Sequence, residues 1–538
     1  MTVEQFSTRV VIVGGGPVGM GLAIDLGQRG VRCHVIERYP TPQRVPKGQN
    51  LTQRTGEHFL VWGVREAIAE ARFIPPEVST GGLTTYGTLL SDYHYGWLSR
   101  EKVRAFYYTD NDRLPQYQTE AVLRKRVAEL ESVTCHYGYR VTSVSAQQGR
   151  AQVMAITDDG QTIEISGDYA VGCDGSRSVV REAAQISQIR DDHDKKMVLL
   201  VFRSTQLVEL LKRYPDKSYF NVLNPELGGY WQFFGKVDLG EQFFFHAPVP
   251  ADTTEDNYDF HSMLKEIVGA DIDVAFDYIG FWDLRIATAR TYRAGCLMIA
   301  GDAAHSHPPY GGFGINTGFE DVRNLGWKLE AVLGGLAPET LLDTYSLERQ
   351  PVFKSTADDF IGKMIEDDKN FVSEFDPARD LSAFESAWAL RSEGGDKEVF
   401  NFEPNYEGSP IVLGGAGGPC SARGAHSYDA RPGHHLAPAE WTSGTSMGEA
   451  LGHGFCLIAL DASEAERTII RTWLADAGYA AKVVHDSYAG TRARWAHRFI
   501  LVRPDHFVAW VGDQLPEQFE SIWRASLGHH ALDRASAA

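Results

Sequence analysis

The 538-residue sequence has few cysteines, and no continuous apolar run in it approaches 18 residues. Its six cysteines are widely spaced and form no C-x-x-C pair, so we interpret them as reduced thiols. The absence of a membrane-spanning run and of a cleavable leader at the start favours a cytoplasmic protein with no membrane partner. Because no histidines and cysteines cluster at ligand spacing, we predict no metal site.

Positive charge is also scarce, because 52 Lys and Arg residues face 71 Asp and Glu residues, for a formal net charge of −19. This balance argues against nucleic acid as a partner, although it leaves room for a local basic pocket. With 43% hydrophobic and 23% charged residues, the composition is that of a globular protein. The length predicts three to four domains.

A glycine-rich turn between two apolar strands is the first sign of a ligand. Residues 9–37 predict a strand, a turn, a helix and a second, parallel strand. Gly14, Gly16 and Gly19 form G-x-G-x-x-G, which permits a tight turn, a close approach of a pyrophosphate and close packing of the helix. Glu37 ends the second strand, where an acid binds ribose hydroxyls and disfavours a 2′-phosphate.

Two more apolar strands end in an aspartate. Asp174 lies in YAVGCDGSRSVVR, which alone would be a plain strand and turn, and Asp302 follows CLMIAG. Ligands of α/β proteins bind at the carboxyl ends of strands, so Asp302 is placed to accept hydrogen bonds from ligand hydroxyls. Residues 308–314 then form a loop poor in side chains, which suits a flat ring. A helix expected to begin after Asn316 would stabilise negative charge on that ligand.

These three motifs, in this order and spacing, resemble those of the class A flavoprotein monooxygenases, the para-hydroxybenzoate hydroxylase and phenol hydroxylase family. The resemblance implies one FAD and a transiently docked NADH or NADPH. By this resemblance the cofactor-binding residues are Gly14, Gly16, Pro17, Gly19, Glu37, Arg38, Arg44, Gln116, Asp174, Asp302, Pro309, Gly312, Gly314, Ile315 and Asn316. The family also leads us to expect a homodimer.

The resemblance extends to the C-terminal region. RPGHHLAP at residues 431–438 and LVRPDHFVAWV at residues 501–511 resemble the thioredoxin-like domain of the phenol hydroxylase branch, with His506 where that branch has glycine. We expect this domain to serve packing or dimer contact, because Cys456 stands alone and provides no dithiol centre.

The expected fold is therefore α/β with three parts. A Rossmann-type FAD-binding domain is expected at residues 1–185 and 280–375, with an inserted antiparallel-sheet substrate domain at 186–279 and a contribution from about 75–110. The thioredoxin-like domain is expected at residues 395–538.

The resemblance implies a monooxygenase that uses O2, through a C4a-hydroperoxyflavin, to hydroxylate a phenolic ring. Candidates for the catalytic residues are His246 and Tyr230, with Arg285 to steady an anion, although each is equally plausible as a structural residue. Other candidates of the same standing are His94, Tyr95, Tyr107 and Tyr108. The predicted substrate-binding residues are Trp231, Phe233, Phe243 and Phe245, with a plain sheet core as the equal alternative.

Lacking a carboxylate-binding cluster, the sequence slightly favours a large neutral phenol over a small benzoate as the aromatic substrate. Two alternatives stay open at this stage. One is an FAD-dependent epoxidase or Baeyer–Villiger oxygenase that acts on a polyketide-like aromatic or ketone. The other is a non-catalytic flavin-binding assembly module, against which the intact glycine loop at residues 311–314 argues.

Overall fold

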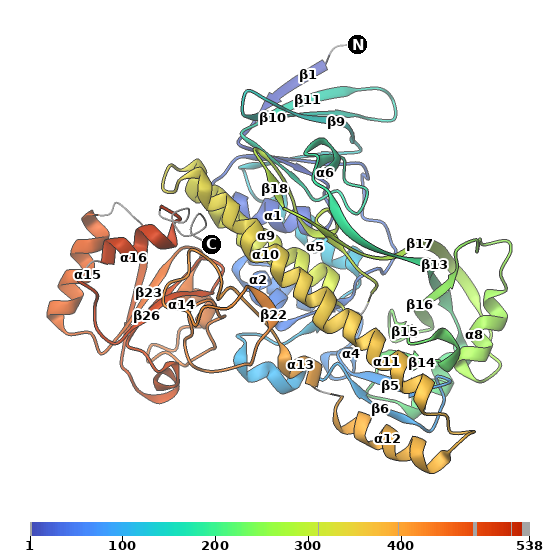
Figure 1. The fold of residues 1–538 in the computed structure, drawn as a ribbon. Helices are drawn as coiled ribbons and strands as arrows, with labels where there is room; N and C mark the ends of the chain where they lie inside the picture. Colours follow the sequence, from blue (N-terminus) through green and yellow to red (C-terminus); the bar gives the residue numbers. More distant parts are fainter. Residues whose placement is uncertain (1–2, 310, 396, 477–480, 518, 530–538) are drawn as a thin grey trace.

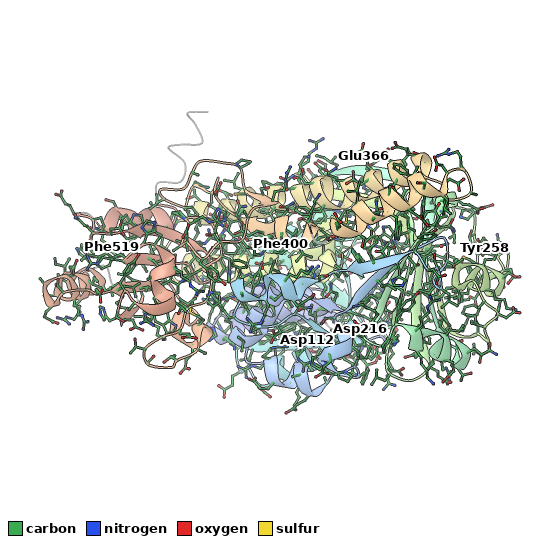
Figure 2. All side chains as sticks on the ribbon, turned by 90° about the horizontal axis from the view of Figure 1, so that it is seen from below. Asp112, Asp216, Tyr258, Glu366, Phe400 and Phe519 are labelled. Carbon is green, nitrogen blue, oxygen red and sulfur yellow. The ribbon has the colours of Figure 1, made fainter. Side chains whose placement is uncertain are left out.

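Three sheets follow one another along the molecule (Figure 1). The computed structural model describes residues 3–309, 311–395, 397–476, 481–517 and 519–529. A six-stranded sheet lies at the centre, an eight-stranded sheet at one end and a C-terminal four-stranded sheet at the other. Seen from below, the molecule extends from Phe519 in the C-terminal part to Tyr258 beside the eight-stranded sheet (Figure 2).

The central sheet contains the predicted strand–turn–helix–strand unit. Its order is β18 (Arg293–Ala294), β19 (Leu297–Ile299), β12 (Tyr169–Gly172), β2 (Val10–Val13), β3 (Cys33–Glu37) and β8 (Val133–Tyr137). All neighbours pair in parallel except β18 with β19. Helix α1 (Pro17–Gln28) joins β2 to β3 and packs against α9 (Phe313–Leu333). All four residues of β2 are buried, as in strands covered on both faces.

A small four-stranded sheet lies beside the central sheet, and two short strands form a separate two-stranded sheet. The small sheet contains β1 (Val3–Ser7), β11 (Thr162–Gly167), β10 (Arg150–Ile156) and β9 (Arg140–Gln147), in that order. The two-stranded pairing is β4 (Asn50–Leu51) with β7 (Asp112–Arg113). Helix α5 (Gln116–Val127) follows β7 and packs on α1.

The eight-stranded sheet carries most of the aromatic residues noted in the sequence. Its order is β20 (His305–Ser306), β17 (Ala275–Ala289), β13 (Gln188–Arg203), β16 (Gln242–Pro250), β15 (Trp231–Lys236), β14 (Tyr219–Leu223), β5 (Gly82–Tyr86) and β6 (His94–Trp97). It is antiparallel except between β14 and β5. The sheet therefore includes strands from residues 75–110, as expected, and continues past residue 279 to β20. The limits of the separate domains stay a prediction.

The C-terminal sheet is mixed, as in thioredoxin-like domains. Strand β23 (Cys456–Leu460) pairs in parallel with β24 (Lys482–Asp486) and antiparallel with β25 (Phe499–Val502), which pairs with β26 (Val508–Gly512). Helix α15 (Glu464–Asp476) connects the parallel pair. His506 lies between β25 and β26 with φ +67°, a left-handed conformation that glycine adopts most readily.

A buried group of four charged residues joins this C-terminal part to the helices of the central part. Arg503 binds Glu348 at 2.6 Å and Asp505 at 2.6 Å, and Lys328 of α9 binds Glu348 at 2.6 Å. Glu348 lies on α10 (Asp343–Ser355). Although burial raises it, Arg503 and Lys328 hold the pKa of Glu348 well below its usual range. The interface therefore depends on complete pairing of its charges, because an unpaired buried charge is costly.

All six cysteines are free thiols. Within the ranges described above, no helix combines the length and the apolar character needed to cross a membrane. The same residues contain no cluster of three or more side chains that could hold a metal ion.

Candidate functional site

A cavity of about 1090 Å³ extends from the β2–α1 turn to the inner face of the eight-stranded sheet. At one end it is lined by the first glycine motif and by the ends of β3, β12 and β19, and at the other by strands β13 to β17. The loop before α9 lies between the two ends. A single cavity therefore connects a nucleotide-type turn to an aromatic surface.

The glycine turn has the geometry that its three glycines predict. A Cβ on Gly14, which has φ +101°, would lie 2.4 Å from the Cys173 carbonyl oxygen. A Cβ on Gly19 would lie 1.9 Å from the Gly14 carbonyl oxygen, so helix and strand touch there. Gly14, Gly16 and Pro17 line the cavity, whereas Gly19 does not and serves packing. The free N–H groups at the start of α1 are therefore open to a phosphate.

Glu37 is buried at the edge of the cavity and already accepts two hydrogen bonds. Its Oε2 accepts the Gly15 N–H at 2.7 Å and its Oε1 accepts the Tyr39 N–H at 2.8 Å. A carboxylate has about four acceptor positions, so capacity remains for ligand hydroxyls. Arg38 and Gln116 line the same end of the cavity, but Arg44 is absent from its lining, although Gln43 and Val45 are present.

Two carboxylates on the cavity have unused acceptor atoms. Asp174 Oδ2 accepts the Val179 N–H at 2.7 Å, but its Oδ1 is buried and has no partner among the described residues. Asp302 lines the cavity, and none of the described side chains or N–H groups bonds its carboxylate. Burial raises the pKa of Asp174, whereas Asp302 is open to the cavity. These orphaned acceptors suit a ligand rich in hydroxyls, and they fit the ribose and ribityl groups of FAD.

The loop before α9 contains two consecutive left-handed glycines. Gly311 has φ +59° and Gly312 has φ +69°, and α9 then begins at Phe313, earlier than the sequence predicts. A Cβ on Gly312 would lie 2.8 Å from the Asn50 amide. Successive N–H groups in such a turn, at a helix N-terminus, form a site that favours negative charge. Pro309, Gly312, Gly314 and Ile315 all line the cavity, where the flavin ring was predicted.

Asn316 does not line this cavity, so its predicted contact with the cofactor stays a prediction. Its Nδ2 donates to the carbonyls of Gly312 at 2.6 Å and Asn50 at 2.8 Å. Its Oδ1 accepts from Thr52 N–H at 2.9 Å and Thr55 Oγ1 at 2.6 Å. Because both donors and both acceptor positions of the amide are used, Asn316 positions the loop and has none left for a ligand.

In β16 the phenylalanine that faces the cavity is Phe244, whereas the sequence predicts its neighbours Phe243 and Phe245. Strand pairing sets Phe233 opposite His246 and Phe234 opposite Phe245. Since alternate residues point to opposite faces, Phe244 shares the cavity face with Phe233 and His246.

Phe243 and Phe245 face the other way, into the core beneath α8 (Phe260–Val268), so they are not cavity residues. Trp231 packs with Phe233 and Phe244 without reaching the cavity lining. Tyr230 is likewise outside the lining, with Lys195 Nζ 5.5 Å from the centre of its ring. None of His94, Tyr95, Tyr107 and Tyr108 lines this cavity.

His246 and Arg285 do line the cavity. His246 is 2% exposed, and its ring packs 5.3 Å from that of Trp282 and 6.3 Å from that of Phe233. Burial lowers the pKa of His246 to about 3, so the imidazole is neutral at pH 7. Its Nδ1 has no hydrogen-bond partner among the described residues. Tyr219, which no sequence motif marks, also lines this end, and its ring stacks on that of Phe233 with the ring centres 5.6 Å apart.

Two families match different parts of the chain. Residues 7–359 match the family described as FAD binding domain, and residues 429–530 match the family described as aromatic-ring hydroxylase, C-terminal. A 4-methyl-5-nitrocatechol 5-monooxygenase of Burkholderia sp is 30% identical over 97% of this chain and 97% of its own length. A Streptomyces halstedii protein with the provisional name polyketide hydroxylase is 33% identical over 64% of this chain.

The match to the Streptomyces halstedii protein covers only 63% of that relative. Among solved structures, the flavin-dependent monooxygenase PieE in complex with FAD and substrate superposes with a TM-score of 0.84. The two chains are 23% identical, and the superposition covers 97% of this chain and 99% of that one, which supports the fold.

Proposed function

Since the chain belongs to the FAD-binding-domain family, among FAD-dependent monooxygenases of aromatic and polyketide substrates, we propose that it hydroxylates a phenolic ring with NADH or NADPH and O2. The observation that carries the proposal is the single cavity, which joins the glycine loop at α9 to an aromatic pocket containing His246. A ring bound between these two ends lies next to both.

The residues at the nucleotide end would hold FAD. The free N–H groups of α1 bind the pyrophosphate, and Glu37 and Asp302 accept hydrogen bonds from hydroxyls of the cofactor. The left-handed turn at Gly311 and Gly312 directs N–H groups to the ring and stabilises negative charge on it. When bound and reduced by the nicotinamide cofactor, FAD supplies the activation of O2 that no side chain can provide.

The residues at the aromatic end would orient the substrate and exclude water. Phe233, Phe244 and Tyr219 provide flat apolar walls for an aromatic ring. His246, neutral in this setting, accepts a hydrogen bond from the substrate hydroxyl and increases electron density on the ring. Its lowered pKa makes it a weak base, so it acts by polarising the hydroxyl, without taking up a full charge. Arg285 stabilises negative charge that develops on the substrate hydroxyl.

The proposal is tested with purified protein loaded with FAD. NADH or NADPH consumption is followed with a panel of phenols, catechols among them, and products are identified by mass. We expect one phenol to accelerate consumption and to gain one oxygen atom. His246→Phe, which keeps a ring and removes the acceptor, should reduce that rate by about tenfold or more, as for loss of one positioned hydrogen bond. His261→Phe, on the exposed side of α8, serves as the matched control.

A second candidate is oxygen insertion into a polyketide-type ketone or double bond. The relative named as a polyketide hydroxylase and the size of the cavity favour it, because 1090 Å³ accommodates more than a cofactor and one small ring. Consumption of NADH or NADPH that responds only to ketones or fused-ring polyketides would support this alternative. The predicted homodimer is a separate question, which sedimentation of the purified protein answers.

A further inference from the structure

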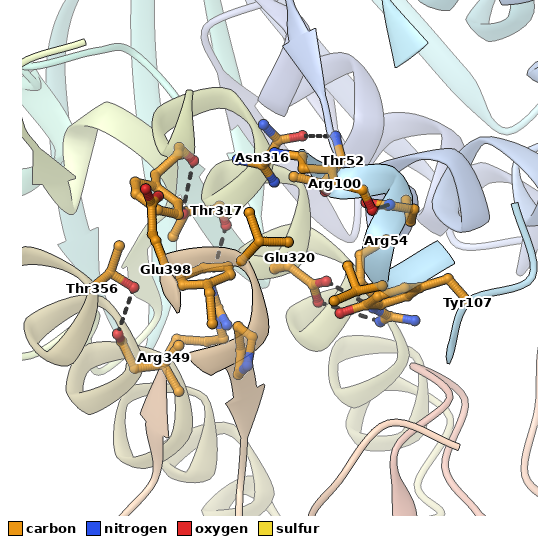
Figure 3. Close-up of a pocket in the computed structure, with 17 residues that line it drawn as sticks. Thr52, Arg54, Arg100, Tyr107, Asn316, Thr317, Glu320, Arg349, Thr356 and Glu398 are labelled. Atoms are coloured by element: carbon orange, nitrogen blue, oxygen red, sulfur yellow. Dashed lines mark hydrogen bonds and ion pairs between the residues drawn. The ribbon is translucent and has the colours of Figure 1, made fainter. Parts of the chain in front are cut away.

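A second, smaller cavity, drawn in Figure 3, has a volume of about 60 Å³ and is lined by Phe313, the residue that follows the glycine loop. Its walls come from the start of α2 (Gln53–Val61), the 3-10 segment η1 (Arg100–Phe106), α9, α10 and α13 (Lys397–Asn401). Phe313 lines both this cavity and the large one, so the two cavities lie on either side of the same residue. Groups in the second cavity are therefore close to the loop that was assigned to the flavin ring.

Arg100 connects the second cavity to that loop. Its Nη2 donates to the Gly311 carbonyl at 2.7 Å, and its guanidinium carbon lies 6.0 Å from the centre of the Phe313 ring. Its own carbonyl accepts Gln53 Nε2 at 2.7 Å, which fixes the backbone of η1. The side chain is 7% exposed, and its Nε is buried without a hydrogen-bond partner among the described residues.

Arg100 is the least neutralised of the three arginines that Figure 3 labels in this cavity. Arg54 binds Glu320 at 3.0 Å, and Arg349 binds Asp321 at 2.8 Å. Arg100 makes no ion pair with the residues that the structure describes, although the charge of Glu398 acts on it from within the same cavity. A guanidinium stays protonated even when buried, so a largely uncompensated positive charge lies directly behind the loop.

The hydrogen bond from Arg100 also sets the orientation of one peptide unit. The peptide between Gly311 and Gly312 is trans, so its C=O and N–H point in opposite directions. Since the C=O accepts from Arg100, the trans geometry places the N–H of Gly312 on the side away from Arg100, and Gly312 lines the large cavity. Arg100 thus polarises the same peptide whose N–H faces the proposed ring site.

We propose that Arg100 is a positioning residue that fixes the Gly311–Gly312 peptide and stabilises the negative charge of reduced FAD from behind the loop. This inference rests on the proposed function, because it requires FAD in the large cavity. Arg100 does not touch the large cavity. Its effect is therefore electrostatic, through the peptide, and is expected on the redox equilibrium of the flavin more than on the binding of oxidised FAD.

The test compares full-length Arg100→Met, Arg100→Gln and Arg100→Lys with wild type, without substrate. Arg104→Met is the matched control, because Arg104 lies on the same segment but pairs with the exposed Asp110. The dissociation constant of oxidised FAD is measured by fluorescence, and the two-electron midpoint potential is measured against a reference dye. Folding of each variant is checked by circular dichroism.

We expect the two neutral variants to favour oxidised over reduced flavin by about tenfold relative to wild type, which corresponds to a potential about 30 mV lower. Arg100→Lys, which keeps the charge, and Arg104→Met should stay close to wild type. If Arg100→Met does not fold, Arg100→Gln carries the same prediction, since it keeps an N–H donor and loses only the charge. Neutral variants that bind FAD with an unchanged potential would overturn the inference, and a wild-type chain that binds no FAD would overturn the proposed function with it.

Discussion

Replacing Asn316 by alanine should weaken the flavin loop without removing any group that lines the large cavity. Its amide makes four hydrogen bonds, which join the Gly312 carbonyl at 2.6 Å to the segment from Asn50 to Thr55. The residue is 5% exposed, so water cannot easily replace these bonds. At about 1 kcal/mol for each bond, the substitution should lower the free energy of unfolding by about 3–5 kcal/mol.

The assay separates positioning from direct contact. The thermal midpoint of the FAD-free protein is measured first, and FAD is then titrated. Because the lost bonds hold the protein and not the cofactor, Asn316→Ala should lower the midpoint of the FAD-free protein by several degrees. The dissociation constant of FAD should also rise by about tenfold or more, since FAD must then order the loop as it binds.

Asn370→Ala is the control, because Asn370 is exposed on α11 (Lys363–Glu374). An Asn316→Ala protein that melts with the control when free of FAD, yet binds FAD poorly, would refute our account and restore Asn316 as a direct cofactor ligand.

Three more changes have outcomes that the structure specifies. Asp302→Ala should leave the purified protein with little FAD by absorbance, because an acceptor for ligand hydroxyls is lost; full occupancy and turnover would make Asp302 a plain strand-end residue. His246, with a folded pKa of about 3 against about 6.5 unfolded, contributes stability that is complete above pH 6.5 and declines as the pH falls toward 3. At pH 4.5 this loss amounts to about 2–3 kcal/mol, and His246→Gln should remove that part of the acid sensitivity; an identical pH profile of unfolding would contradict it. Arg503→Met should lower the free energy of unfolding by about 3–5 kcal/mol, because the buried carboxylates of Glu348 and Asp505 lose a positive partner. Arg471→Met, at an exposed ion pair, should change the melting curve little.

The glycine motif and the aspartates at the strand ends could be predicted because their signals are local. Gly14 and Gly19 must be glycine on account of backbone atoms within a few residues or in the adjacent strand. Asp174 and Asp302 end apolar runs, and parallel strands bring such ends to one edge of the sheet. Gly14, Asp174 and Asp302 line the cavity, and Gly19 packs directly against Gly14.

The aromatic end was harder to predict because the choice of face depends on strand register. A run such as Phe243-Phe244-Phe245 gives no indication of which residue faces the cavity, and α8 decides this by covering one side of the sheet. The partners of Asn316 and Arg100 lie 211 to 266 residues away in the chain, apart from Gly312, at 4 residues, and Gln53, at 47 residues. No local pattern marks such contacts, so only the folded structure shows that these two residues hold the loop.

Incorporation of labelled oxygen tests the central claim most directly. The FAD-loaded protein is supplied with NADH or NADPH, ¹⁸O-labelled O2 and the phenol that most accelerates nicotinamide oxidation, and the product is analysed by mass spectrometry. Our account predicts a product that carries one labelled oxygen atom on its aromatic ring. An unlabelled product, or nicotinamide oxidation that yields only hydrogen peroxide with every phenol and polyketide offered, would contradict it.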